Sequence, residues 1–346
     1  MVDYREMLMT SRVLLVFAVA GFALFAPPEP VARAQTPVQL GGRCTLTGNA
    51  ELPVNLPIYD ASGQVIARFS GGESPLRASE FPNDASGRVR VETAIGRGGF
   101  RISGAIELGK LPLHTAYSVP IVAGHLWIRP NQSVSPVAGA PGKLKIQKSL
   151  TFPLHQTFTA WAPCSALTFA AGTPPGWTVP GNARGYVLKR ESLDLYDEPA
   201  PGATVIATLQ RSPAAAGVLF FSTEQRGGFV RVEHQGEIAV DAWAKAGDLA
   251  ALPRGETMDQ QTPPRSQRTP PRLSLSAAPK VVRPTKEVPL RGAAKDSAPV
   301  IGVIEIGTET YVMDVMAGWA SVMPQSLHVI PPEGAHFWVK PSDLGI

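Results

Sequence analysis

Short stretches in which apolar and polar residues alternate recur along the chain, and a glycine introduces the clearest of them. These stretches are Gly-Arg-Val-Arg-Val at 87–91, Gly-Phe-Val-Arg-Val at 228–232 and Gly-Trp-Ala-Ser-Val at 318–322. Successive side chains of a strand face opposite sides of a sheet, so this period of two predicts half-buried strands that follow turns. We expect the arginines of 87–91 to face solvent and its valines to face the core.

Three apolar segments end alike, which indicates internal repetition. Trp161, Trp243 and Trp338 each precede a leucine by six residues. Upstream, Tyr196 precedes Trp243 by 47 residues, the same distance that separates Arg291 from Trp338. The repeats divide most of the chain into four small β units. We place these at residues 35–110, 111–170, 181–252 and 280–346.

Composition supports short strands joined by turns and limits the other possibilities. The 346 residues include 34 prolines and 33 glycines, and only 17% are charged, which excludes a coiled coil or a long helical bundle. We therefore predict an all-β fold. Units of this size have small cores, so the first two should need packing against neighbours or a disulfide between them.

Two proline-containing segments separate the units. Residues 171–180 predict a hinge, and residues 253–279 predict a linker rich in proline and arginine, in which Thr-Pro-Pro-Arg occurs twice. The linker has too little apolar sequence to fold and favours an extended polyproline II spacer. Alternatively, it is a basic tether to anionic polymers or a proline-rich peptide for the groove of a partner.

The fourth unit resembles the bacterial SH3-like domain of exported and cell-wall proteins. The similarity covers Val-Pro-Leu-Arg-Gly at 288–292, the apolar strand 300–304, Tyr-Val-Met at 311–313, Gly-Trp at 318–319, and Phe-Trp-Val at 337–339 followed by Leu344. The resemblance implies a small, bent, five-stranded barrel for each unit, so we expect tandem SH3-like barrels joined by the proline-rich segments described above. The third unit is similar to a lesser degree. Phe337 replaces a glycine of the family, and the loop 323–336 is longer than usual.

Four tryptophans and two other residues are candidates for special roles. A tryptophan that recurs beside alternating apolar residues is typical of a small barrel's core, so we predict a structural core role for Trp161, Trp243, Trp319 and Trp338. The alternative is an aromatic platform for a sugar or peptide. Tyr196 and Arg291, at equivalent positions near the end of a first strand, are candidate ligand-binding residues.

The N-terminus and the cysteines predict the compartment. Arg5 and Arg12 precede an apolar run at 13–25, and Val-Ala-Arg-Ala at 31–34 matches a signal-peptidase site, so residues 1–34 are a predicted signal peptide. The run is too short to span a membrane, and we expect no integral membrane segment in the mature chain. Export to the periplasm or outside the cell permits a disulfide between Cys44 and Cys164. Unpaired thiols and a catalytic cysteine are the alternatives.

Motifs for chemistry are not evident. The six histidines show no metal-binding spacing, and neither a nucleophile elbow nor a phosphate-binding loop occurs, so we expect no metal, no cofactor and no catalytic residues. A net charge of +4 without a concentrated basic face does not predict nucleic-acid binding.

Together these features predict an exported, non-catalytic binding or scaffolding protein. The resemblance implies peptidoglycan or another component of the bacterial cell envelope as the ligand. The alternative is a protein-interaction subunit that positions or regulates a separate envelope enzyme. An enzyme with an unrecognised site is the third interpretation.

Overall fold

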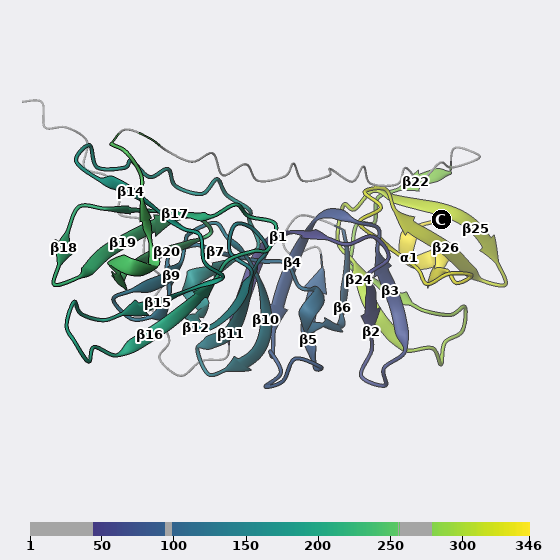
Figure 1. The fold of residues 1–346 in the computed structure, drawn as a ribbon. Coiled ribbons are helices and arrows are strands. Elements are labelled where there is room, and N and C mark those ends of the chain that lie inside the picture. The colour runs from purple at the N-terminus through teal and green to yellow at the C-terminus, as the bar shows by residue number, and fades with distance from the viewer. Residues whose placement is uncertain (1–43, 94–98, 255, 257–278) are drawn as a thin grey trace, which may run out of the picture. The chain divides into compact units, whose positions relative to one another are not determined.

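Strands dominate the computed structural model, which describes residues 44–93, 99–254, 256 and 279–346 (Figure 1). The predicted all-β class is confirmed. The described residues also contain three 3-10 turns and one short α-helix: η1 (Leu108–Lys110), η2 (Cys164–Ala166), η3 (Ala246–Asp248) and α1 (Pro341–Leu344). The predicted signal peptide 1–34 lies outside the described residues, as does most of the predicted linker 253–279.

The largest antiparallel sheet combines strands of the first and the fourth β units. From the first unit it takes β1 (Thr45–Leu52), β2 (Pro57–Tyr59), β3 (Val65–Phe69), β4 (Gly72–Ser79), β5 (Arg88–Thr93) and β6 (Phe100–Glu107). From the fourth it takes β22 (Lys280–Val282), β23 (Val288–Arg291), β24 (Val300–Ile304), β25 (Thr310–Met316), β26 (Trp319–Pro324), β27 (Val329–Ile330) and β28 (Phe337–Val339). The sheet is continuous because β6 pairs with β24, and β3 also pairs with β27.

The second unit contributes to both of the other sheets. A five-stranded sheet consists of β7 (Leu113–Thr115), β10 (Ser133–Ala140), β11 (Lys143–Leu150), β12 (Gln156–Pro163) and β13 (Leu167–Thr168). The third unit's sheet contains β14 (Arg184–Leu188), β15 (Ser192–Tyr196), β16 (Val205–Gln210), β17 (Val218–Ser222), β18 (Gln225–Arg226), β19 (Phe229–Gln235), β20 (Ile238–Lys245) and β21 (Ala250–Ala251). It is extended by two strands of the second unit, β8 (Val119–Val122) and β9 (Leu126–Ile128).

The junction between β9 and β20 is buried and supported by charged side chains. Ile128 pairs with Ile238, and both are fully buried. Next to them the guanidinium of Arg129 donates hydrogen bonds to the carbonyls of Gln235 and Gly236, each at 3.1 Å. Burying a charged group without hydrogen-bond partners is costly, and these two bonds offset the cost of burying the Arg129 guanidinium.

Alternation along the strands explains which side chains form the core. In β5, Val89 and Val91 are buried while the arginines between and beside them are exposed, as the sequence pattern predicts. β19 and β26 each begin directly after a glycine, also as predicted. The described residues contain two clusters of buried apolar side chains. One includes residues of the first, second and fourth units, and the other joins the second and third.

The predicted core role of the tryptophans is wrong for Trp161, which is 43% exposed. Trp243 and Trp338 are only partly buried, and Trp319 alone of the four is buried, with 7% exposed. The reason is the strand period: Trp161 and Trp243 each lie between two buried alanines. Because successive residues face opposite sides, the alanines occupy the core face and the tryptophans the outer face.

In β28 the core position belongs to Phe337, which is fully buried. Its ring lies 5.9 Å from that of Phe100 in β6, measured between ring centroids, so Phe337 packs against the first unit. The next residue, Trp338, faces outward and pairs with Arg291.

A disulfide joins Cys44, just before β1, to Cys164 in η2, as predicted. It connects the first unit to the second across 120 residues of sequence, with the two Cα atoms 5.7 Å apart. In the chain-entropy account, a crosslink that closes so long a loop stabilises the fold by about 4 to 5 kcal/mol. Such bonds persist in non-reducing compartments. Within the described residues, no helix has the length and apolarity to cross a membrane.

His234 on β19 is buried. Its Nδ1 lies 3.0 Å from the carbonyl oxygen of Leu219, an arrangement in which the ring donates a hydrogen bond. Burial lowers the pKa of His234 below its ordinary value of 6.5, and the positive charge of Arg129 lowers it further, while the bond to Leu219 opposes the shift. In the unfolded chain the imidazole binds a proton at a higher pH than in the folded protein.

We expect acidification to destabilise the protein through His234. Because the pKa of His234 is lower in the folded protein than in the unfolded chain, only the unfolded chain binds the proton readily as the pH falls below about 6.5. The free energy of unfolding should therefore decrease below that pH, by up to about 1.4 kcal/mol per pH unit. Denaturant unfolding between pH 7.5 and 5 should therefore show a steeper loss in the native chain than in a His234→Asn variant. Equal slopes would contradict the prediction.

The core assignment of β28 gives a second prediction. Replacing Phe337 with alanine should lower the free energy of unfolding by about 3 to 5 kcal/mol, because it leaves a cavity in a fully buried site. The matched variant Trp338→Ala should cost clearly less, since that side chain is partly solvated. Urea titration of the two variants measures both values, and the reverse ranking would place Trp338 in the core.

Candidate functional site

The junction between β6 and β24 brings the first and fourth β units into one sheet. Phe100, Arg101 and Ile102 pair with Ile304, Val303 and Gly302. A Cβ atom at residue 302 would lie 2.3 Å from the carbonyl oxygen of Arg101, a distance that side chains do not adopt. The absence of a side chain at Gly302 therefore allows β24 to approach β6.

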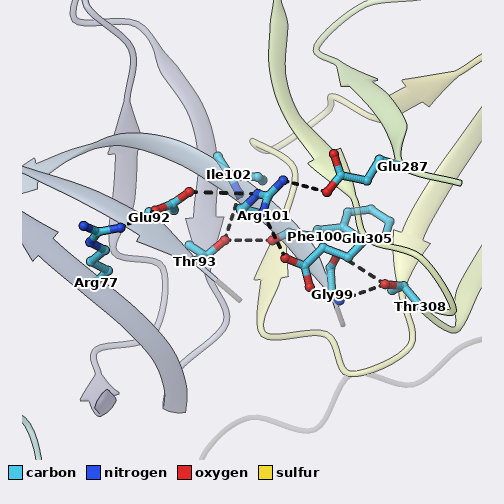
Figure 2. A network of polar contacts seen from close by, with 10 residues as sticks. All are labelled: Arg77, Glu92, Thr93, Gly99, Phe100, Arg101, Ile102, Glu287, Glu305 and Thr308. Atoms are coloured by element: carbon cyan, nitrogen blue, oxygen red, sulfur yellow. Dashed lines mark hydrogen bonds and ion pairs between the residues drawn. The ribbon is translucent and has the colours of Figure 1, made fainter. Parts of the chain in front are cut away.

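A polar network surrounds this junction, as Figure 2 shows. Its centre is Arg101, whose guanidinium lies 2.9 Å from Glu287 and 3.4 Å from Glu305 of the fourth unit. On the other side it reaches Glu92 of β5 at 3.9 Å. The side chain of Arg101 is 34% exposed, so water screens these ion pairs and each contributes at most about 1 kcal/mol. Their arrangement places one arginine among carboxylates of both units.

Two buried hydroxyl groups hold the beginning of β6. Thr308 Oγ1 accepts a hydrogen bond of 2.8 Å from the backbone N–H of Gly99, and Thr93 Oγ1 accepts one of 2.9 Å from that of Ile102 (Figure 2). Thr93 also donates to the carbonyl of Phe100 at 2.7 Å. The strand is thus bound on one side by its own unit and on the other by the fourth.

The first cavity lies at this junction and has a volume of about 400 Å³. Its walls come from both units: Asn49, Glu73, Ser74, Pro75, Thr93, Gly99 and Phe100 of the first, and Pro324, Ser326, His328 and Val329 of the fourth. Phe100 and Val329 are buried and provide apolar surface, whereas Ser326 is exposed at the rim. Ser74 is 1% exposed, and its hydroxyl has no hydrogen-bond partner.

The second cavity, of about 510 Å³, lies where β2, β5 and β6 meet β24. The guanidinium of Arg88 stacks 3.7 Å above the ring of Tyr59, and Arg90 forms an ion pair of 3.2 Å with Glu80. At the rim, the hydroxyl of Ser62 and the backbone N–H of Gln64 hold the pKa of Asp60 below its ordinary value. This cavity is therefore bordered by charges of both signs.

The structure keeps the two candidate ligand-binding residues, Tyr196 and Arg291, apart. Tyr196 belongs to the third unit's sheet and Arg291 to the largest sheet, and neither is among the residues that line the two cavities. They do occupy the same register position, since Tyr196 pairs with Trp243 as Arg291 pairs with Trp338.

Both side chains are engaged within their own units. Tyr196 is 7% exposed and its ring packs edge-on against that of Phe229, with the centroids 5.5 Å apart. The Nζ of Lys245 lies 5.2 Å from the centre of the same ring, and a hydrogen bond to Tyr196 raises the pKa of this lysine. The guanidinium of Arg291 donates to the carbonyl of Ala298.

Sequence reasoning did not identify the residues of the first cavity. Ser74, Ser326 and His328 carry no motif, and they come together only because strands far apart in the sequence pair. The one usable signal was the glycine in the middle of the apolar strand 300–304, since a glycine inside a strand often marks a close backbone approach. No three histidine, cysteine, aspartate or glutamate side chains cluster as metal ligands in the described part of the chain.

Comparison of the chain with protein-family models, with curated proteins and with solved structures finds no match.

Substitution of Gly302 should separate the two units. We expect Gly302→Ala to lower the free energy of unfolding by about 1 to 3 kcal/mol, because its methyl group must displace backbone atoms of β6. Amide hydrogen exchange should accelerate at residues 99–102 and 302–305. Gly292→Ala is the matched control, since the added methyl group would lie 4.0 Å from Ile301, an ordinary contact distance. Unchanged exchange in Gly302→Ala would contradict the importance of this approach.

Proposed function

We propose that the protein is an exported, non-catalytic binding or scaffolding module of the bacterial cell envelope, and that the first cavity binds peptidoglycan or another envelope component. The observation that carries the proposal is the lining of that cavity. Residues within 49–100 of the first unit and within 324–329 of the fourth unit line it together. Ligand sites commonly lie at such junctions and combine apolar surface with a few polar groups.

The chemistry of the lining fits a small piece of a glycan or peptide. Phe100 and Val329 offer apolar contact for the carbon face of a sugar or for an aliphatic side chain. The hydroxyl of Ser326 and the imidazole of His328 offer hydrogen bonds. The disulfide supports function in a non-reducing compartment, in agreement with the expected export.

A second candidate function is a protein-interaction subunit that positions or regulates a separate envelope enzyme. Exposed apolar side chains on the edge of the largest sheet favour it. Val281 on the edge strand β22 is 45% exposed, and Met313, Val315 and Met316 on the neighbouring β25 are 42%, 52% and 51% exposed. Grouped exposed apolar residues beside a sheet edge are typical of surfaces that meet another protein.

Binding to insoluble peptidoglycan tests the first proposal. The mature chain, residues 35–346, should sediment with purified peptidoglycan at low and at high salt. Ser326→Trp, which fills the cavity from its exposed rim, should weaken binding at least tenfold, equivalent to about 1.4 kcal/mol. Gln325→Trp is the matched control, because this exposed neighbour does not line the cavity.

Failure of the native chain to sediment, or equal sedimentation of both variants, would contradict binding in the first cavity. In the former case, co-purification of a stoichiometric protein partner that is lost in Val315→Asp would support the second candidate.

A further inference from the structure

The middle of the chain has an unusual distribution of charge. All 28 aspartates and glutamates lie outside residues 108–190, whereas this stretch contains eight lysines and arginines. It includes the whole five-stranded sheet, so no strand of that sheet carries a carboxylate side chain. A surface of this kind repels cations and attracts anions.

Within this sheet, β11 and β12 present one face to the core and the other to solvent. Alternate residues of the two strands are buried, including Leu144 and Ile146 of β11 and Ala160 and Ala162 of β12. The outer face therefore consists of the residues that alternate with these: Lys143, Lys145, Gln147, Ser149, Thr157, Thr159, Trp161 and Pro163. The three strands β10, β11 and β12 lie beside one another in Figure 1.

Trp161 is the only aromatic residue of this outer face, and two lysines flank it. Its side chain is 43% exposed, and Lys145 lies directly opposite it in the strand register. The Nζ of Lys143 is 5.1 Å from the centre of the indole ring. Among the described residues, neither lysine forms an ion pair, whereas the buried Lys148 of the same strand contacts Glu237 at 2.9 Å.

The rest of the face offers neutral hydrogen-bonding groups. Gln147 lies opposite Thr159, and the hydroxyls of Ser149 and Thr157 are 3.1 Å apart within one hydrogen bond. Hydroxyl and amide groups both donate and accept, which matches the hydroxyl groups of a sugar.

We propose that this outer face of β11 and β12 binds an anionic polysaccharide whose sugar rings carry carboxylates. The indole of Trp161 stacks on the apolar face of one ring, and the two ammonium groups pair with carboxylates on that ring and its neighbour. Thr159 and Gln147 bond to sugar hydroxyls along the strand direction. A single-stranded nucleic acid is the less suitable occupant, because such ligands are held by a series of stacking aromatic residues and this face has one.

The inference goes beyond the proposed function, since this face shares no residue with the first cavity. Because the side chains of Trp161, Lys143 and Lys145 lie on the outer face, their substitution should cost little folding free energy, and the variants below should fold normally. Thermal unfolding of each variant confirms this before binding is measured.

Calorimetric titration of the mature chain with polygalacturonate tests the proposal. We expect binding that weakens with salt and is not observed with neutral dextran. Trp161→Ala and the double variant Lys143→Gln/Lys145→Gln should each lose at least tenfold in affinity, while Trp161→Phe should retain part of it. Matched controls are Tyr117→Ala, which removes an aromatic side chain that is 67% exposed, and Lys189→Gln, which removes an exposed lysine of the third unit.

Equal affinity for dextran, or unchanged affinity in both Trp161→Ala and the double lysine variant, would overturn the proposal. Tighter binding of oligothymidylate than of polygalacturonate would also overturn it and assign the face to nucleic acid. Ser326→Trp should leave polygalacturonate binding unchanged, so failure at this face and failure at the first cavity are distinguishable.

Discussion

Pairing between strands that are distant in sequence holds this protein together. β6 would otherwise end the first unit's sheet with unpaired backbone groups, and β24 would do the same for the fourth unit. Unpaired strand edges are costly when buried and promote aggregation when exposed. Pairing β6 with β24 supplies hydrogen-bond partners to the backbone groups of both edges. The second and third units are joined in the same way through β9 and β20. Strands from segments far apart in the sequence are thereby combined into larger sheets.

Side chains around these junctions add specificity to the backbone pairing. At β6 and β24 the contribution is electrostatic, since one arginine faces carboxylates from both units. At β9 and β20 it is a buried arginine bonded to backbone carbonyls. Salt bridges at partly exposed positions contribute little stability, but a mismatched charge at a sheet junction is unfavourable, so such groups help to select the partner strand.

The same arrangement creates the surfaces to which we assign binding. The first cavity exists because loops of the fourth unit lie against strands of the first. The tryptophan-bearing face exists because alanines, rather than tryptophans, occupy the core side of β12. Both sites are consequences of tertiary pairing acting on a simple alternating pattern.

The sequence by itself determined the all-β class, the strands that follow glycines, the inward valines of β5 and the Cys44–Cys164 disulfide. These follow from local patterns: a period of two, turn residues and the presence of two cysteines in a chain expected to be exported. It did not determine which strand edges meet, because backbone hydrogen bonds are nearly independent of side-chain identity and join residues as distant as Arg101 and Val303. Nor did it determine which side of a strand faces the core around Trp161, since alternation defines two faces without saying which is buried. Tertiary packing made that choice, and it placed the cavity residues together from segments that carry no motif.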